Sequence, residues 1–428
     1  MDMYARIIVL LWISLVDGFR THGKSICPQT FVCICISSRK YDPYGPEEAL
    51  VDCSSMSLIT VPPFRDFEGI VIKEILFNNN KIKHINARAF AGLNISLISF
   101  SNNPLSHIAP NSFEGIHGLT TLMFGGCSLS DFPNIFRYTP EIVDLSIDRN
   151  NITYISPGTF QPLKKLHFLD LSRNPVLFHD HIFGGLEESL RDLKLNGMGL
   201  KYIPVNAIKR LKHIDNLELQ DNLFTKLTKD TFNGLPKNRF THYIFDRNGI
   251  RHIDPDAFRD HPTPIYLDLH GNKLKRLDFI EEPCHFQSSV IHLHGNPIHC
   301  DCRIYNLTKY QQITLHGDCA TPTKYRKLPI AHEPELHGKH GSRRSFASFA
   351  AAECGDPHPE ERIRCPCHHE EPIELLDEHD KQHMHQMSCN NYVLVEANEQ
   401  SLNRAGNNYV FSMAAVLVLL ASMLATTS

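Results

Sequence analysis

The stretch Leu166–Asn174, which reads LHFLDLSRN, decides the fold of this chain. Leucines occupy its first, fourth and sixth positions, and an asparagine closes it at the ninth. Asparagine recurs at the same place at intervals close to 24 residues, at Asn80, Asn103, Asn150, Asn174, Asn222, Asn248, Asn272 and Asn296. A fixed period of this length is typical of stacked structural units that bury a continuous core together.

The spacing L-x-x-L-x-L-x-x-N is the signature of a leucine-rich repeat. It predicts an α/β-type solenoid, a horseshoe with a parallel β-sheet on its concave face. The asparagine amide is expected to turn inward and bond backbone groups that would otherwise be buried and unpaired. Cys127 and Met198 fill the two gaps in the series, which makes about ten repeats over residues 71–299. A thiol fits the ladder position, whereas Met198 predicts a local irregularity. Phenylalanines on the return segments, such as Phe90 and Phe160, are expected to fill the outer core.

Composition narrows the class of function. With 428 residues and 42% apolar content, the chain can bury a large core. Its formal net charge of −4 indicates neither nucleic acid nor an anionic membrane as a partner. The catalytic motifs G-x-S-x-G and H-E-x-x-H and a phosphate-binding glycine loop do not occur, so neither an enzyme nor a cofactor is expected.

Both ends of the chain have the composition of targeting segments. Residues 1–18 contain a short apolar run followed by small residues, which predicts a secretory signal peptide. Residues 407–428 are largely apolar and predict a hydrophobic anchor or a GPI-attachment signal, with Asn403 or Gly406 as the candidate lipidation site. A transmembrane helix is the alternative interpretation of the same residues. The expected location is the extracellular face of the plasma membrane, and secretion is the alternative.

Cysteines flank the repeats on both sides. Cys27, Cys33, Cys35 and Cys53 predict a disulfide-stapled N-terminal cap over residues 27–70, with three possible connectivities. A zinc site is the competing interpretation, and it is disfavoured in a secreted chain. A second cap is expected over residues 300–354, with cysteines at Cys300, Cys302, Cys319 and Cys354. Residues 355–406, rich in histidine and cysteine, predict a mobile stalk.

The sequence HLHGNPIHCDC at residues 292–302, with two later cysteines, resembles the C-terminal cap of extracellular leucine-rich repeat proteins. Together with the N-terminal cap, the arrangement is similar to that of Slit, the Nogo receptor, Toll-receptor ectodomains and connectin. The resemblance covers roughly residues 27–354, although Ile298 stands where the family often has tryptophan. It implies a protein that binds other proteins at cell surfaces and has no catalytic activity.

Residues between the ladder leucines predict the binding surface. Parallel strands stack about 4.8 Å apart, so equivalent positions in successive repeats form columns on the concave face. Acidic residues dominate these columns at Asp144, Asp148, Asp170, Asp192, Glu218, Asp246 and Asp268, with Lys194 interrupting them. In the opening stretch, the expected ligand-facing residues outside the consensus are His167, Phe168, Asp170, Ser172 and Arg173. Either the surface docks a basic partner, or it is an ordinary solvated face.

Histidines replace the acids toward the end of the repeats. His270, His292 and His294 are close enough in the predicted register to form a metal site or a pH-sensitive group, with His242 one repeat earlier. Exposed histidines in a polar sheet are the alternative. Three N-x-S/T sequons, at Asn94, Asn151 and Asn306, predict glycosylation at the repeat edges.

The combined prediction is a cell-surface protein that binds protein ligands through its concave face, in adhesion or as a co-receptor. A secreted non-catalytic partner subunit or a metal-binding carrier is the alternative. The oligomeric state is left open.

Overall fold

The architecture was determined from a computed structural model, which describes residues 31–37, 47–64, 70–233, 235, 242–261, 264–331, 345–359 and 361–364. The predicted signal peptide, the anchor segment with Asn403 and Gly406, Cys27 and most of the predicted stalk lie outside these residues. Among the described residues, no helix is both long and apolar enough to cross a membrane.

The chain divides into two compact units. Unit 1 comprises Met1–Leu166 and Asp170–Leu186, and unit 2 comprises His167–Leu169 and Glu187–Ser428. Strand β9 contributes residues to both. Each unit is a parallel β-solenoid in which every turn adds one short strand to a sheet, as the repeat spacing predicts.

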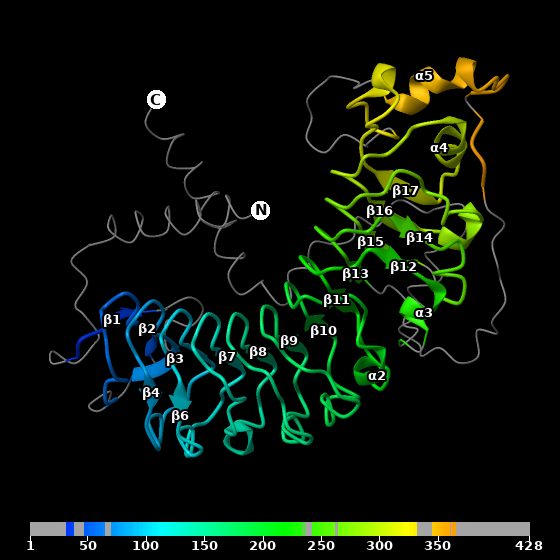
Figure 1. Cartoon of the computed structure of the whole chain (residues 1–428). Coiled ribbons are helices and arrows are strands. Elements are labelled where there is room, and N and C mark those ends of the chain that lie inside the picture. The colour runs from blue at the N-terminus through cyan, green and yellow to red at the C-terminus, as the bar shows by residue number, and fades with distance from the viewer. Residues whose placement is uncertain are drawn as a thin grey trace, which may run out of the picture. The chain divides into compact units, whose positions relative to one another are not determined.

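Unit 1 begins with an antiparallel pair and continues as a parallel stack in chain order (Figure 1). Its main-sheet strands are β1 (Ile34–Ser37), β2 (Glu47–Asp52), β3 (Ile70–Leu76), β5 (Leu97–Ser99), β7 (Thr121–Met123) and β8 (Asp144–Ser146), followed by β9 (Phe168–Asp170). A small parallel sheet of β4 (His84–Ile85) and β6 (His107–Ile108) and the 3-10 helix η1 (Phe136–Tyr138) complete the unit.

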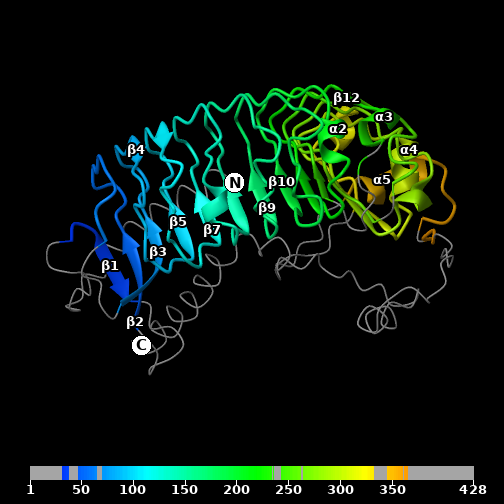
Figure 2. The ribbon, with the colours of Figure 1, turned by 90° about the horizontal axis from the view of Figure 1, so that it is seen from below.

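Unit 2 repeats the plan with helical segments on its return loops. Its main sheet has the order β10 (Asp192–Lys194), β11 (Asn216–Glu218), β13 (His242–Ile244), β15 (Tyr266–Asp268), β16 (Ser289–His292) and β17 (Ile313–His316). A second sheet pairs β12 (Lys226–Leu227) with β14 (His252–Ile253). The helices are α2 (Val205–Ile208), α3 (Lys229–Phe232), η2 (Pro283–Phe286), α4 (Cys302–Leu307), η3 (Thr323–Tyr325) and α5 (Phe346–Glu353). Figure 2 shows β12 set apart from the main-sheet strand β10 across the width of the coil.

The asparagine ladder has the predicted role. The side-chain amide of Asn174 donates to the carbonyl oxygens of Ile147 and Leu171, at 2.9 and 3.1 Å, and its Oδ1 accepts from the N–H of Ile152 at 3.1 Å. Each ladder asparagine therefore ties one turn to the turn before it. Because these backbone groups are buried, the bonds remove a large desolvation cost.

Cys127 replaces a ladder asparagine closely. Its Sγ donates to the Phe100 carbonyl at 3.4 Å, and the backbone amides of Asn103 and Leu105 lie against the same sulfur. Cys127 is a buried free thiol, as predicted.

Met198 has no such amide, yet the irregularity predicted at this repeat is absent from its strand. Strand β10 pairs with β11 in unbroken register from Asp192 to Lys194. The backbone geometry is maintained from the next turn, because Oδ1 of Asn222 accepts the Met198 N–H at 2.9 Å.

Phenylalanines form the outer part of the core, as predicted. Phe90 and Phe113 are fully buried and stack with their ring centroids 5.2 Å apart in unit 1. In unit 2, Phe232 and Phe258 lie 4.5 Å apart. Rings placed at the same point of successive turns fill the wider side of the coil.

Disulfides staple both ends of the repeat array. Cys33–Cys53 holds the N-terminal segment, and Cys35 is also disulfide-bonded. At the other end, the bonds are Cys300–Cys319 and Cys302–Cys354.

The folded C-terminal region extends past residue 354, where the sequence predicted a stalk to begin. Ile363 forms a parallel bridge with Tyr310, and the Asp356 carboxylate bonds both Tyr305 and Lys309, at 2.6 and 2.8 Å.

Candidate ligand-binding surface

The outward side chains of the short strands form the columns that the repeat period predicts. In unit 2, strand register aligns Asp192 with Asn216 and His242, and it aligns Lys194 with Glu218 and Ile244. The middle residue of each strand is buried and the two flanking residues are partly exposed. This alternation arises because successive side chains of a strand point to opposite faces. Any ligand of this face meets the flanking columns. We call this surface the strand face of each unit.

In unit 1, the acidic residues are engaged by neighbouring side chains. Asp148 accepts a bond from the Ser146 hydroxyl at 2.7 Å and forms an ion pair with Arg149 at 2.8 Å. The Thr121 hydroxyl donates to Asp144 at 3.2 Å. Asp170 accepts from the backbone N–H of Ser172 at 2.9 Å. The predicted acidic columns are therefore present, but Arg149 neutralises part of their charge.

Some residues of the stretch Leu166–Asn174 lie at the surface and others in the core. His167 is exposed just ahead of strand β9, and the Phe168 ring is partly exposed on the strand face. Ser172, which was expected to face a ligand, is only 6% exposed. Its backbone bond to Asp170 makes it a structural residue of the turn.

Phe168, Lys194 and Glu218 form a connected group at the start of the unit 2 strand face. The Lys194 ammonium lies 5.3 Å from the centroid of the Phe168 ring and forms an ion pair with Glu218 at 2.9 Å. Asn196 also donates to Glu218, at 2.9 Å. A cation held between a ring face and a carboxylate is fixed in position and partly desolvated. We call these three residues the cation–aromatic group.

The carboxyl groups of Asp192 and Asp246 on this face have raised pKa values. Burial is the main cause that raises the pKa of Asp192, and the Asn216 amide bonded to it acts in the opposite direction. Burial also raises the pKa of Asp246, against the opposing effect of its ion pair with Arg247. Arg247 additionally pairs with Asp221 at 2.8 Å. In this half of the face, the acidic columns are thus a network of bonded charges.

A row of ring side chains crosses the later strands of the unit 2 strand face. The ring centroids of His242 and Tyr266 are 4.9 Å apart, those of Tyr266 and His292 are 5.1 Å apart, and those of His292 and His316 are 4.7 Å apart. The four rings come from strands β13, β15, β16 and β17. We call them the aromatic row. Burial lowers the pKa of His242, and it also lowers that of His292, to about 4.

The predicted metal set is not assembled. His292 stacks on His316, His294 lies 3.3 Å from an Asp318 carboxylate oxygen, and His270 is exposed. Across the part of the chain that the structure describes, no three His, Cys, Asp or Glu side chains are grouped to hold a metal ion. The metal prediction therefore has no geometric support at these residues.

Two members of the aromatic row were not identified from the sequence. His316 lies 24 residues after His292 and pairs with it in register, so the repeat period would have located it. His316 lies beyond residue 299, where the sequence predicts that the repeats end. Tyr266 occupies the same column as His242, one turn later, and the contact between the two rings is seen only in the structure.

Family profiles identify the repeat. A profile described as Leucine rich repeat matches residues 130–176, and one described as BspA type Leucine rich repeat region (6 copies) matches residues 53–132. By these profiles, residues 53–176 consist of leucine-rich repeats. This agrees with the disulfide-bonded segments at both ends of the leucine-rich repeats.

Curated relatives share the repeats over part of their length. Leucine-rich repeat and fibronectin type III domain-containing protein 1-like protein of Danio rerio is 24% identical over 217 residues, which is 45% of this chain and 29% of the relative. Leucine-rich repeat-containing protein 3B of Homo sapiens is 38% identical over 88 residues, which is 20% of this chain and 34% of the relative. The chain thus spans about a third of the length of these relatives.

Among solved structures, a similar chain comes from an octameric complex of Latrophilin 3, Unc5D and FLRT2 (LRR). It has 18% sequence identity and a TM-score of 0.49, and the similarity covers 71% of this chain and 97% of that chain.

The three sequons of this leucine-rich repeat protein lie at accessible positions. Asn94, Asn151 and Asn306 are all exposed, and Asn306 is on helix α4, away from the main-sheet strands. Glycans at these positions remain a prediction.

Proposed function

We propose that this leucine-rich repeat protein is a non-enzymatic recognition protein of the cell surface, which binds a protein ligand on its strand face in adhesion or as a co-receptor. The observation that carries the proposal is the unit 2 strand face, where the cation–aromatic group and the aromatic row supply partly buried rings beside fixed charges. Aromatic and cationic side chains that are already partly desolvated are the residue types that dominate protein–protein binding energy.

The chemistry of the surface defines the ligand class. Rings of the aromatic row offer flat apolar contact area, and their polar edges accept or donate hydrogen bonds. The flanking carboxylates of Asp192, Asp246 and Asp268 favour a ligand whose complementary surface has arginine or lysine around an apolar centre. Because Arg247 already pairs with Asp246, and Lys194 with the nearby Glu218, charge sets the orientation and association rate of the ligand more than its affinity.

Display at the surface is the second part of the proposal. The apolar residues 407–428 would attach the chain to the membrane through a GPI group, and residues 1–18 would direct its secretion. Treatment of expressing cells with phosphatidylinositol-specific phospholipase C is expected to release the protein into the medium. Retention on the cells would favour a transmembrane anchor, and appearance in the medium without the lipase would favour secretion.

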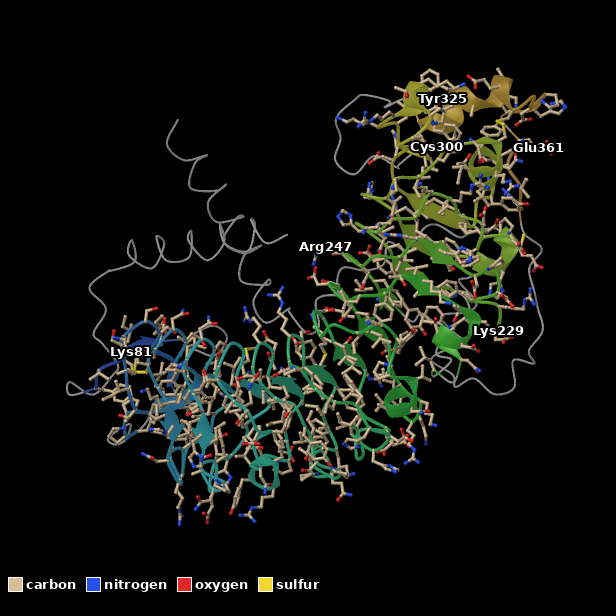
Figure 3. The ribbon with its side chains drawn as sticks, viewed as in Figure 1. Lys81, Lys229, Arg247, Cys300, Tyr325 and Glu361 are labelled. Atoms are coloured by element: carbon tan, nitrogen blue, oxygen red, sulfur yellow. A yellow bond between two sulfur atoms is a disulfide. The ribbon has the colours of Figure 1, made fainter. Side chains whose placement is uncertain are left out.

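The binding proposal is tested with the full-length protein displayed on cells and a panel of purified extracellular domains. A ligand found in this way is expected to lose at least about tenfold in affinity to the variants Tyr266→Ala and Lys194→Glu, since loss of one central contact typically costs more than 1 kcal/mol. The matched controls are Lys229→Glu and Arg259→Ala, which alter exposed cations away from the strand face. Figure 3 shows Lys229 and the strand-face residue Arg247 on opposite sides of unit 2. A ligand lost with the controls and retained by the strand-face variants would refute the proposal.

A further inference from the structure

A second surface of unit 2 concentrates positive charge. It lies on the segments that follow the ladder positions, outside the main sheet, and includes the short sheet of β12 and β14. Its six exposed cations are Lys201, Lys226, Arg251, Lys273, Lys275 and Arg276. We call this surface the basic face.

Backbone bonds place these residues on neighbouring turns. The Arg251 N–H donates to the carbonyl of Thr225 at 2.9 Å, and the Lys273 N–H donates to that of Ile250 at 2.8 Å. Strand register sets Lys226 beside His252. Since adjacent parallel strands are about 4.8 Å apart, the cations form a ladder of positive charge along the coil axis.

Three of the six cations line a pocket of about 240 Å³. Its lining consists of Arg251, His252, Ile253, Lys275, Arg276 and Asp278. The nearby acids already have partners. Asp278 pairs with Arg303 at 3.4 Å, and Asp254 lies 3.0 Å from the His252 imidazole, with which it forms an ion pair when the ring is protonated. Within the described residues, none of the six cations of the basic face has an ion-pair partner. This distinguishes the basic face from the strand face, where Lys194 and Arg247 are paired.

The repeat itself does not require cations at these positions. In unit 1, Lys81 and Lys83 stand at the corresponding positions after Asn80, but the following turn, after Asn103, has no lysine or arginine there. The corresponding residues after Asn150 include Thr153 and Tyr154, and those after Asn174 include Leu177 and Phe178; all four are uncharged, and Tyr154 and Leu177 are exposed. Cations on several neighbouring turns are therefore particular to the basic face, and a binding role explains them.

We propose that the basic face binds a sulfated polysaccharide. A linear polyanion meets a row of cations at several points at once, and the pocket between Arg251, Lys275 and Arg276 has room for a sulfate group. Tyr202 and Leu223 are exposed at the Lys201 end of the face, but among the described residues from 224 to 300, which surround the pocket, no large apolar side chain is strongly exposed. The pocket region therefore lacks the apolar centre of a protein interface. Because the whole chain has a net charge of −4, a polyanion would be attracted by the cations of this face and not by the protein as a whole. The site is separate from the strand face and does not depend on a ligand there.

The test measures binding of the full-length protein to heparin over a range of sodium chloride concentrations. Wild-type protein is expected to bind with an affinity that falls steeply with salt, because each engaged cation releases counterions from the polyanion. The triple variant Arg251→Ala/Lys275→Ala/Arg276→Ala is expected to bind at least tenfold more weakly, with a flatter salt dependence. The matched control is Lys81→Ala/Lys83→Ala/Lys164→Ala, which removes three exposed cations from unit 1 and should bind as wild type.

Two further measurements make the test decisive. In the first, lysines of the wild-type protein are acylated with and without heparin. Heparin should reduce acylation at Lys226, Lys273 and Lys275 but not at Lys81. This measurement locates the site without any variant. Polyglutamate serves as the competitor that represents an acidic protein segment. Absence of heparin binding at low salt, unchanged binding by the triple variant, or displacement by polyglutamate as effective as that by heparin would each overturn the proposal.

Discussion

The imidazole ring of His292 stacks on that of His316, with the ring centroids 4.7 Å apart and the ring planes inclined by 21°. One face of His292 thus lies against a second titratable ring, while Tyr266 lies on its other side at 5.1 Å. Burial is the main cause that lowers the pKa of His292 to about 4, and the neighbouring charge of His316 is the next largest. The aromatic row is consequently neutral at His292 at physiological pH.

This pKa makes the stability of unit 2 depend on pH. The pKa of His292 is about 4 in the folded state and 6.5 in its ordinary state, so the unfolded chain binds more protons between these values. The contribution of His292 to stability is greatest above pH 6.5 and is lost as the pH is lowered toward 4. The melting temperature of wild type is expected to fall by a few degrees more between pH 7.5 and pH 5 than that of His292→Phe, for a contribution of about 1 kcal/mol after allowance for solvent exposure. His270→Phe, at an exposed neighbouring position, is the control and should keep the wild-type pH dependence. If the melting temperatures of wild type and His292→Phe changed equally with pH, His292 could not be the source of this pH dependence.

Cys127 is predicted to be chemically inert in the native protein. Burial raises the pKa of its thiol to about 11, although the backbone amides of Asn103 and Leu105 act in the opposite direction. The thiolate is the reactive form, so at pH 8 alkylation of native Cys127 by iodoacetamide should be very slow. Denaturation should make the thiol reactive at an ordinary rate, as followed by mass spectrometry of the Cys127 peptide. Rapid labelling of native protein would show that the sulfur is not held in the ladder.

Substitutions at two ladder positions are expected to change the free energy of unfolding in opposite directions. Asn174→Ala leaves the carbonyls of Ile147 and Leu171 and the N–H of Ile152 without the bonds of the Asn174 amide, and it is expected to destabilise by roughly 2–4 kcal/mol. Met198→Asn introduces an amide where the series lacks one and is expected to stabilise by about 1 kcal/mol. Urea unfolding of the two variants beside wild type measures both effects. If Met198→Asn destabilised as much as Asn174→Ala, position 198 could not be an incomplete ladder position.

Much of the fold follows from the sequence because each repeat makes local, periodic contacts. The asparagine ladder, the outer phenylalanines and the free thiol of Cys127 all depend on positions a fixed 24 or so residues apart. Connectivity of the C-terminal disulfides could not be derived, because closing loops of similar length costs similar entropy. Asp356 is some 50 residues from its partners Tyr305 and Lys309 in the sequence. Because it lies outside the repeats, no periodic pattern predicts these bonds.

For the candidate binding surface, the sequence predicts which residues share a column of the strand face but not which side chains contact one another. Spacing placed Asp192, Lys194 and Glu218 on one face correctly. It could not show that Lys194 lies over the Phe168 ring while it pairs with Glu218, because side-chain torsions decide which neighbour a flexible lysine reaches. The surplus of acidic residues therefore suggested a stronger negative surface than the paired side chains produce.

Asp356 is predicted to hold helix α5 against the cap. Its carboxylate accepts bonds from the Tyr305 hydroxyl at 2.6 Å and the Lys309 ammonium at 2.8 Å, and these bonds lower its pKa to about 2. The stabilisation is present above the ordinary pKa of 3.8 and is lost as the pH falls through about 2, so at neutral pH the contact is complete. The variant Asp356→Asn is expected to reduce hydrogen-exchange protection across Phe346–Glu353 at pH 7, because Lys309 loses its charged partner. The matched control is Glu353→Gln in helix α5, which removes an exposed ion pair with Lys324 of η3 and should leave that protection nearly unchanged. Equal loss of protection in the two variants would mean that Asp356 has no special role, and that the Cys302–Cys354 disulfide alone retains the helix.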